Sequence, residues 1–301
     1  MTPFIHVWRM TCYEWFDALR SRRALVALLL YMATSVGTMY WSISLLQKVE
    51  KELASILLLP ASEHPGAIAT TLWKSKPFQG IMRQVSKNNE VFNDIQGKNP
   101  VELIYAWLSF FYMPLLVVLI AANRIPEEMG SGAVRYIAFR TSRGAWVLGK
   151  FFGQVSLIAL AVIISGLCAY AVARFRLGRY APVEIVWNMA FWAARAWIYS
   201  IPFVGLIMGL SLFTKSASKS TIFGILALVG LAIITGVTTF FRAGTGWCVV
   251  LPYIAALFPS DYEMLLWRSS PQPLITGAIF LVTLGFTYLG VGYFFFKKRD
   301  L

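Results

Sequence analysis

The fold class follows first from residues Trp146–Ala173. This stretch reads WVLGKFFGQVSLIALAVIISGLCAYAVA and carries one charge, Lys150, near its start. A helix needs about 20 mostly apolar residues to cross the hydrocarbon core of a bilayer, so this stretch is long enough to span a membrane. Four more stretches of this kind lie at 24–46, 103–123, 220–241 and 273–296.

A sixth apolar stretch, 183–213, is longer than one span needs and is interrupted by Asn188, Arg195 and Pro202. We expect an interfacial segment to about residue 195 and a span from there to 213. Six spans would form a single transmembrane domain over residues 1–301. The predicted fold is therefore an all-α integral membrane protein with six transmembrane helices.

The composition agrees with this assignment. Apolar residues make up 58% of the chain and charged residues only 14%, which excludes a water-soluble enzyme because a soluble fold needs a charged surface. The net charge of +13 is typical of cytoplasmic loops that contact anionic headgroups. The expected partner is the lipid bilayer, and no nucleic acid is expected. Cys12, Cys168 and Cys248 lie far apart, which indicates neither a disulfide scaffold nor a zinc site.

The distribution of charge predicts an orientation. With the N-terminus inside, the inner segments carry a net charge of +9 and the outer ones +4, in line with the positive-inside rule. We predict a protein of the bacterial cytoplasmic (inner) membrane with both termini in the cytoplasm. In residues 1–23, Trp8, Cys12 and Phe16 recur near helical spacing, which favours a cytoplasmic amphipathic helix in the headgroup plane over a signal peptide or a frayed tail.

Three segments outside the spans complete the predicted domain. Residues 47–102 are too polar to enter lipid and form an extracytoplasmic loop, which is either a solvated cap or a contact surface for a partner or substrate. Residues 242–272 hold a short apolar run broken by Pro252, which suits an extracytoplasmic re-entrant region before the last span. Residues 124–145 form a cytoplasmic segment in which Pro126 precedes two acids, as at a helix start. We interpret it as a short charged docking helix, with a solvated loop as the alternative.

Groups that perform catalysis are missing from the predicted spans. The five clear spans contain no Asp or Glu between their ends, although intramembrane chemistry usually needs ionisable groups at depth. Residues 144–150 fit the GxxxxGK part of a P-loop, but Phe151 follows where Ser or Thr must hold magnesium. We therefore predict no catalytic, cofactor or metal site in this chain. Arg195 either faces a substrate pathway or extends to the outer headgroups.

Residues 128–150 resemble a known family. Glu128-x-x-x-Gly132, then Ser142-Arg143 and Leu148-Gly149-Lys150, are similar to a cytoplasmic segment of the permease subunits of ABC-2 type transporters. The ending Phe296–Leu301 and the layout also resemble that family: an amphipathic lead helix, six spans, a sizeable first outside loop and a broken apolar segment before the last span. Phe139, Arg140 and Thr141 stand where the family has a proline.

The resemblance implies a permease of an ABC exporter that is not itself an enzyme. It implies a pathway enclosed with a second permease copy or a homologous permease, and a separate ABC ATPase subunit that binds the ATP. That subunit would dock on a 127–140 helix and the N-terminal segment. The implied docking residues are Glu127, Glu128, Arg135, Arg140 and Arg143. Two alternatives remain from the residues alone: a non-transporting integral membrane enzyme or assembly scaffold, and a secondary transporter.

Overall fold

The computed structural model describes residues 3–56, 89–96, 98–177, 183–241 and 257–298. Every regular element within these ranges is a helix. The elements are α1 (Pro3–Arg20), α2 (Arg22–Ile56), α5 (Asn89–Ile95), α6 (Pro100–Ala121), α7 (Arg124–Gly130), α8 (Ala133–Arg140), α9 (Arg143–Leu177), α10 (Glu184–Ser211), α11 (Ala217–Phe241), α13 (Pro259–Leu266) and α14 (Pro271–Lys297).

Within the described ranges, six helical segments are long and apolar enough to cross a membrane. They are Ala24–Lys48, Pro100–Gly130, Arg143–Leu177, Glu184–Ser211, Ala217–Thr238 and Pro271–Lys297. This confirms the all-α membrane fold with six spans. Residues 57–88 and 242–256 lie outside the described residues, so the outer-loop and re-entrant assignments stay predictions there.

The fourth span differs from the expected arrangement. The helix α10 runs without a break from Glu184 to Ser211, through both Arg195 and Pro202, so no division appears near residue 195. Packing explains this, because α10 lies at the centre of the bundle against α6, α9 and α14 and the neighbours hold the helix across its proline. Arg195 is accommodated because its Nη1 donates to the Leu266 carbonyl oxygen at 3.1 Å.

Glycines set the closest helix contact in the bundle. A Cβ built on Gly205 of α10 would lie 2.1 Å from the Gly285 carbonyl oxygen of α14, and one on Gly209 would lie 2.7 Å from the Tyr288 carbonyl oxygen. Small residues let transmembrane helices touch backbone to backbone, where dispersion contacts are greatest. This crossing fixes the last span against the central helix.

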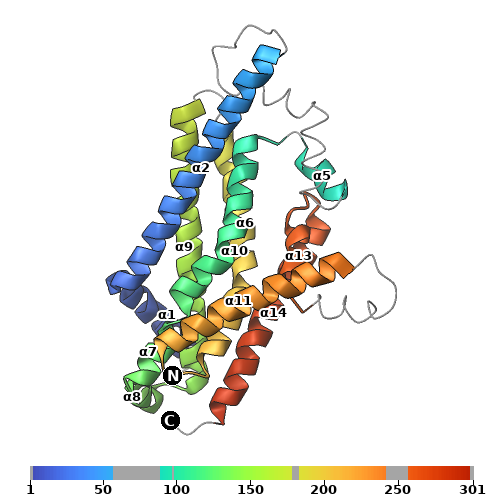
Figure 1. Cartoon of the computed structure of the whole chain (residues 1–301). Coiled ribbons are helices and arrows are strands. Elements are labelled where there is room, and N and C mark those ends of the chain that lie inside the picture. Colours follow the sequence, from blue (N-terminus) through green and yellow to red (C-terminus); the bar gives the residue numbers. More distant parts are fainter. Residues whose placement is uncertain (1–2, 57–88, 97, 178–182, 242–256, 299–301) are drawn as a thin grey trace.

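The short helices gather at the two ends of the bundle. Figure 1 shows α1, α7 and α8 at one end, where α9 begins and α14 finishes, whereas α5 lies toward the opposite end. There α5 is tied to the segment before α14, because Arg268 Nε donates to Asp94 Oδ2 at 2.8 Å and the same guanidinium pairs with Glu90. The end that carries α1, α7 and α8 holds the residues singled out as docking candidates.

Candidate functional site

The predicted docking segment is two helices rather than one. We expected a single short helix over 127–140, but α7 ends at Gly130 and α8 begins at Ala133. Gly132 between them has a φ of 75°, a left-handed conformation that glycine adopts at little steric cost. The chain therefore turns at Gly132, and α7 and α8 can present different surfaces.

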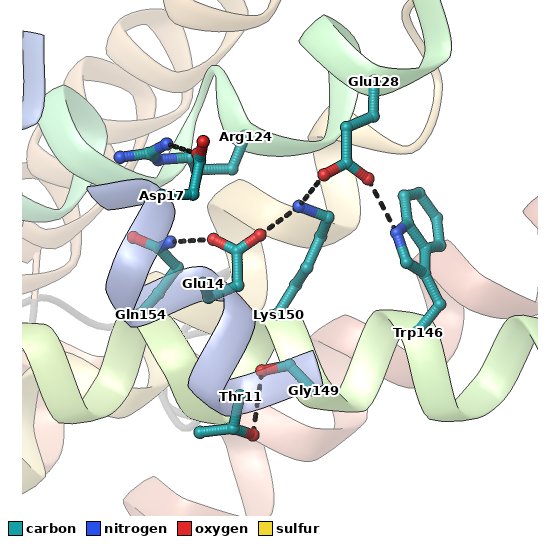
Figure 2. A network of polar contacts seen from close by, with 9 residues as sticks. All are labelled: Thr11, Glu14, Asp17, Arg124, Glu128, Trp146, Gly149, Lys150 and Gln154. Carbon is teal, nitrogen blue, oxygen red and sulfur yellow. Dashed lines mark hydrogen bonds and ion pairs between the residues drawn. The ribbon is translucent and has the colours of Figure 1, made fainter. Parts of the chain in front are cut away.

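Helix α7 turns one of its two acids toward the bundle. Glu128 Oε1 pairs with Lys150 Nζ of α9 at 2.8 Å, and Glu128 Oε2 accepts from Trp146 Nε1 at 2.8 Å (Figure 2). The Trp146 ring packs in turn on Phe296 at the end of α14, with ring centroids 5.9 Å apart. Glu128 was predicted to dock a partner, but its carboxylate binds α9 of the same chain.

A second carboxylate reaches the same lysine from α1. Glu14 pairs with Lys150 Nζ and accepts from Gln154 Nε2 at 2.9 Å. The exposed fraction is 1% for Glu14 and 2% for Lys150. Burying an isolated charge is costly, and the penalty is offset only where opposite charges and hydrogen-bond donors surround it. Glu14, Lys150 and Glu128, with Gln154 and Trp146, form what we call the charge cluster.

Two glycines in α9 let α1 come close enough to complete the charge cluster. A Cβ on Gly149 would lie 2.3 Å from Met10 Cβ, and one on Gly153 would lie 2.6 Å from Glu14 Cβ. Thr11 Oγ1 donates to the Gly149 carbonyl oxygen at 3.2 Å. Helix α1 therefore packs against the Gly149-x-x-x-Gly153 face of α9.

Helix α7 is also fixed to the neighbouring helices α1 and α11. Arg124 Nη1 lies 2.5 Å from Asp17 Oδ2 of α1. Thr221 of α11 donates to Asn123 Oδ1, at the N-cap of α7, at 2.7 Å, and a Cβ on Gly130 would lie 2.6 Å from the Lys215 carbonyl oxygen just before α11. A displacement of α7 therefore acts on α1, α9 and α11 together.

The other predicted docking residues lie apart from the charge cluster. Glu127, Arg135 and Arg140 are exposed, whereas Arg143 Nη1 donates to the Lys297 carbonyl oxygen at 3.4 Å, joining α9 to the end of α14. Sequence reasoning missed Tyr136, whose side chain is 79% exposed on α8 between the two arginines. A large aromatic side chain so exposed on a short charged helix suits an interface.

Arg195, the candidate pathway residue, lies on the side of α10 that faces α13. Its guanidinium carbon lies 4.6 Å from the centroid of the Trp192 ring, and Lys98 Nζ lies 5.1 Å from the same ring. Burial and the neighbouring Arg195 charge both lower the pKa of Lys98. The contact with Leu266 gives Arg195 a role in holding α13 to α10.

The described residues contain no metal-binding constellation. No group of three or more His, Cys, Asp or Glu side chains there could hold a metal ion. The charge cluster has its carboxylates paired with a lysine, an amide and an indole, and these contacts join α1, α7 and α9.

Comparison with known proteins gives two findings. A family model described as "ABC-2 family transporter protein" matches residues 10–301. A curated protein of Stutzerimonas stutzeri, the "Probable ABC transporter permease protein NosY", is 35% identical over 104 residues. This second match covers 34% of the present chain and 36% of that protein, about a third of the relative's length.

Proposed function

Because the chain belongs to the ABC-2 transporter family, we propose that it forms the transport pathway of an ATP-driven exporter together with a second permease subunit and a separate ATPase. The family makes it a membrane subunit of an ABC transporter, and such a transporter implies an ATPase partner. The export direction, the pairing of permeases and the docking residues are parts of the proposal. So is the location of α1, α7, α8 and both termini on the cytoplasmic side of the bacterial inner membrane.

The proposed docking surface is the outer face of α8 with the start of α7. Arg135, Tyr136 and Arg140 on α8 and Glu127 on α7 are exposed. An aromatic residue beside two arginines fits a partner pocket with an apolar floor and an acidic rim. Glu128 is removed from this set because its carboxylate is occupied by Lys150 and Trp146.

The observation that carries the proposal is the attachment of α7 to three helices. Its side chains contact α1 through Arg124 and α9 through Glu128, and Thr221 of α11 donates to Asn123 at the N-cap of α7. When ATP closes the two ATPase subunits, they would push α8, and α7 would carry that push into α1 and two spans as a rigid-body movement. The charge cluster is the proposed mechanical link in this step.

The second permease is proposed to cover the least buried spans. In this chain only 11% of the apolar stretch of α11 is buried, whereas 67% of the corresponding stretch of α10 is buried. Gly230 and Gly236 on α11 have no atom within 4 Å of a Cβ built on them, so a second helix could approach closely there. A partner permease packed on α11 would place the pathway between the two chains.

Co-purification tests the docking proposal. The full chain is expressed in its native host and purified, and the partner must contain a complete GxxxxGK[ST] loop and hydrolyse ATP. We expect an ATPase subunit to co-purify with the wild-type chain and to be absent from the Tyr136→Ala and Arg140→Glu preparations. The matched control is Lys48→Glu, at an exposed lysine at the opposite end of the bundle. Recovery of the chain without any ATPase would favour a scaffold, and undiminished recovery with both α8 variants would contradict the docking surface.

A further inference from the structure

A groove lies between α9 and α10, away from the charge cluster. It encloses about 410 Å³ and is lined by small residues on both helices, among them Ala159, Gly166, Ala190 and Ala194. Its floor is Tyr105 of α6, which fits because a Cβ on Gly166 would lie 2.8 Å from the tyrosine oxygen. Ala190 and Ala194 are exposed, so the groove opens to the surroundings of the bundle.

The walls of the groove offer hydrocarbon and no free hydrogen-bonding group. The Tyr105 hydroxyl donates to the Val162 carbonyl oxygen at 2.9 Å, and Trp197 Nε1 donates to the Val155 carbonyl oxygen at 2.9 Å. Every other lining residue is an apolar side chain except Tyr170 at one end. Since the groove lies within two membrane spans, an acyl chain is the occupant that matches its chemistry.

The groove has the length of one leaflet and ends below a cation. From Ala159 to Tyr170 the helix rises about 16 Å, roughly half of the hydrocarbon core. Residues four apart on a helix lie one above the other, so the exposed Arg174 stands directly above Tyr170. Arg176 serves another purpose, because its Nη2 donates to Ser44 of α2 at 2.9 Å.

Two observations place Arg174 at headgroup depth. The helix rises about 46 Å from Arg143 to Arg174, which matches the bilayer core together with its headgroup layers. Trp187 near the start of α10 is 73% exposed, and exposed tryptophan side chains are enriched at the membrane–water interface. A phosphate at that depth would meet the Arg174 guanidinium, which binds phosphate with parallel hydrogen bonds.

We propose that this groove is a binding site for a glycerophospholipid, with one acyl chain between α9 and α10 and the phosphate on Arg174. The apolar walls, the leaflet length and the cation at the headgroup end all match that one ligand class. The site does not depend on ATPase docking, so its test is independent of the proposed function.

The test uses the full chain in nanodiscs that contain phosphatidylglycerol with a diazirine in one acyl chain. We expect photolabel to concentrate in α9 between 159 and 170 and in α10 between 186 and 197. Ala190→Phe or Ala194→Phe should fill the groove and reduce that label severalfold. Both residues are exposed, so the variants should fold, and Ala33→Phe on the exposed face of α2 is the matched control. Label spread evenly over all lipid-facing helices, or unchanged in both groove variants, would overturn the site.

A second measurement tests the phosphate contact. Native mass spectrometry of the purified chain with phosphatidylglycerol should show about tenfold weaker retention in Arg174→Gln, as expected for the loss of a charge-assisted hydrogen bond. Diacylglycerol, which lacks the phosphate, should be retained equally by both forms. Lys48→Gln, another exposed cation, should leave phosphatidylglycerol retention at the wild-type value. Equal phosphatidylglycerol retention by Arg174→Gln and the wild type would refute the assignment of a phospholipid to the groove.

Discussion

Replacing Lys150 by methionine should be the most damaging single substitution at the α1, α7 and α8 end. Lys150 is 2% exposed and is the cation between Glu14, which is 1% exposed, and Glu128. Methionine has a similar length and keeps the packing, so the effect reports the charge. Two carboxylates would then face each other with only Gln154 and Trp146 as donors. Removing one partner of a buried ion pair costs about 3–5 kcal/mol.

The assay is thermal unfolding of the full chain in nanodiscs, followed by tryptophan fluorescence. We expect the apparent Tm of Lys150→Met to fall by on the order of 10 °C. The triple variant Glu14→Gln, Glu128→Gln, Lys150→Met removes all three charges at nearly constant shape and should recover most of that loss, because neutral replacement of a complete buried pair is often harmless. Lys48→Met is the control for an exposed lysine. A single variant as stable as the wild type, or a triple variant as unstable as the single one, would refute this reasoning.

Other substitutions test separate contacts. Gly149→Leu should separate α1 from α9, because a Cβ at that position would lie 2.3 Å from Met10 Cβ. Labelling of Cys12 with a maleimide should then be faster. In the control Gly37→Leu, where a Cβ meets no atom within 4 Å, the labelling rate should be unchanged. Gly205→Leu should separate α10 from α14 and abolish monodisperse purification; a normal elution profile would contradict the backbone contact. Arg268→Gln should release α5 from the segment before α14, seen as faster hydrogen exchange in α5 with little change in Tm.

Much of the fold was predictable from hydrophobic run length. The span at Trp146–Ala173 and the four like it follow from about 20 apolar residues per crossing, and the structure contains helices over all of them. Residues 183–213 were harder, because Arg195 and Pro202 break the apolar pattern locally. Only the tertiary contacts of α10, such as that of Arg195 with Leu266, explain why one helix continues through both.

The site was only partly predictable. The segment 124–145 was identified by its charges, but a charge pattern does not tell which acid faces inward, so Glu128 was grouped with Glu127. Neither Lys150 nor Glu14 was among the predicted docking residues. The available signal was Gly149-x-x-x-Gly153, which marks a close helix contact beside a buried lysine. The sequence alone does not show that α1 is the helix in contact, since α1 and α9 lie far apart in the sequence.

In the proposed mechanism, an ATPase subunit drives this permease through α8 and α7. The most direct test is ATP hydrolysis and cargo transport by the purified permease–ATPase complex in vesicles, comparing the wild type with the charge-free variant Glu14→Gln, Glu128→Gln, Lys150→Met. We expect the variant to keep its bound ATPase and its stability but to lose most transport per ATP hydrolysed, because α1 and α7 are no longer tied to α9 by charge. Transport per ATP equal to that of the wild type would show that the charge cluster does not transmit the ATPase movement.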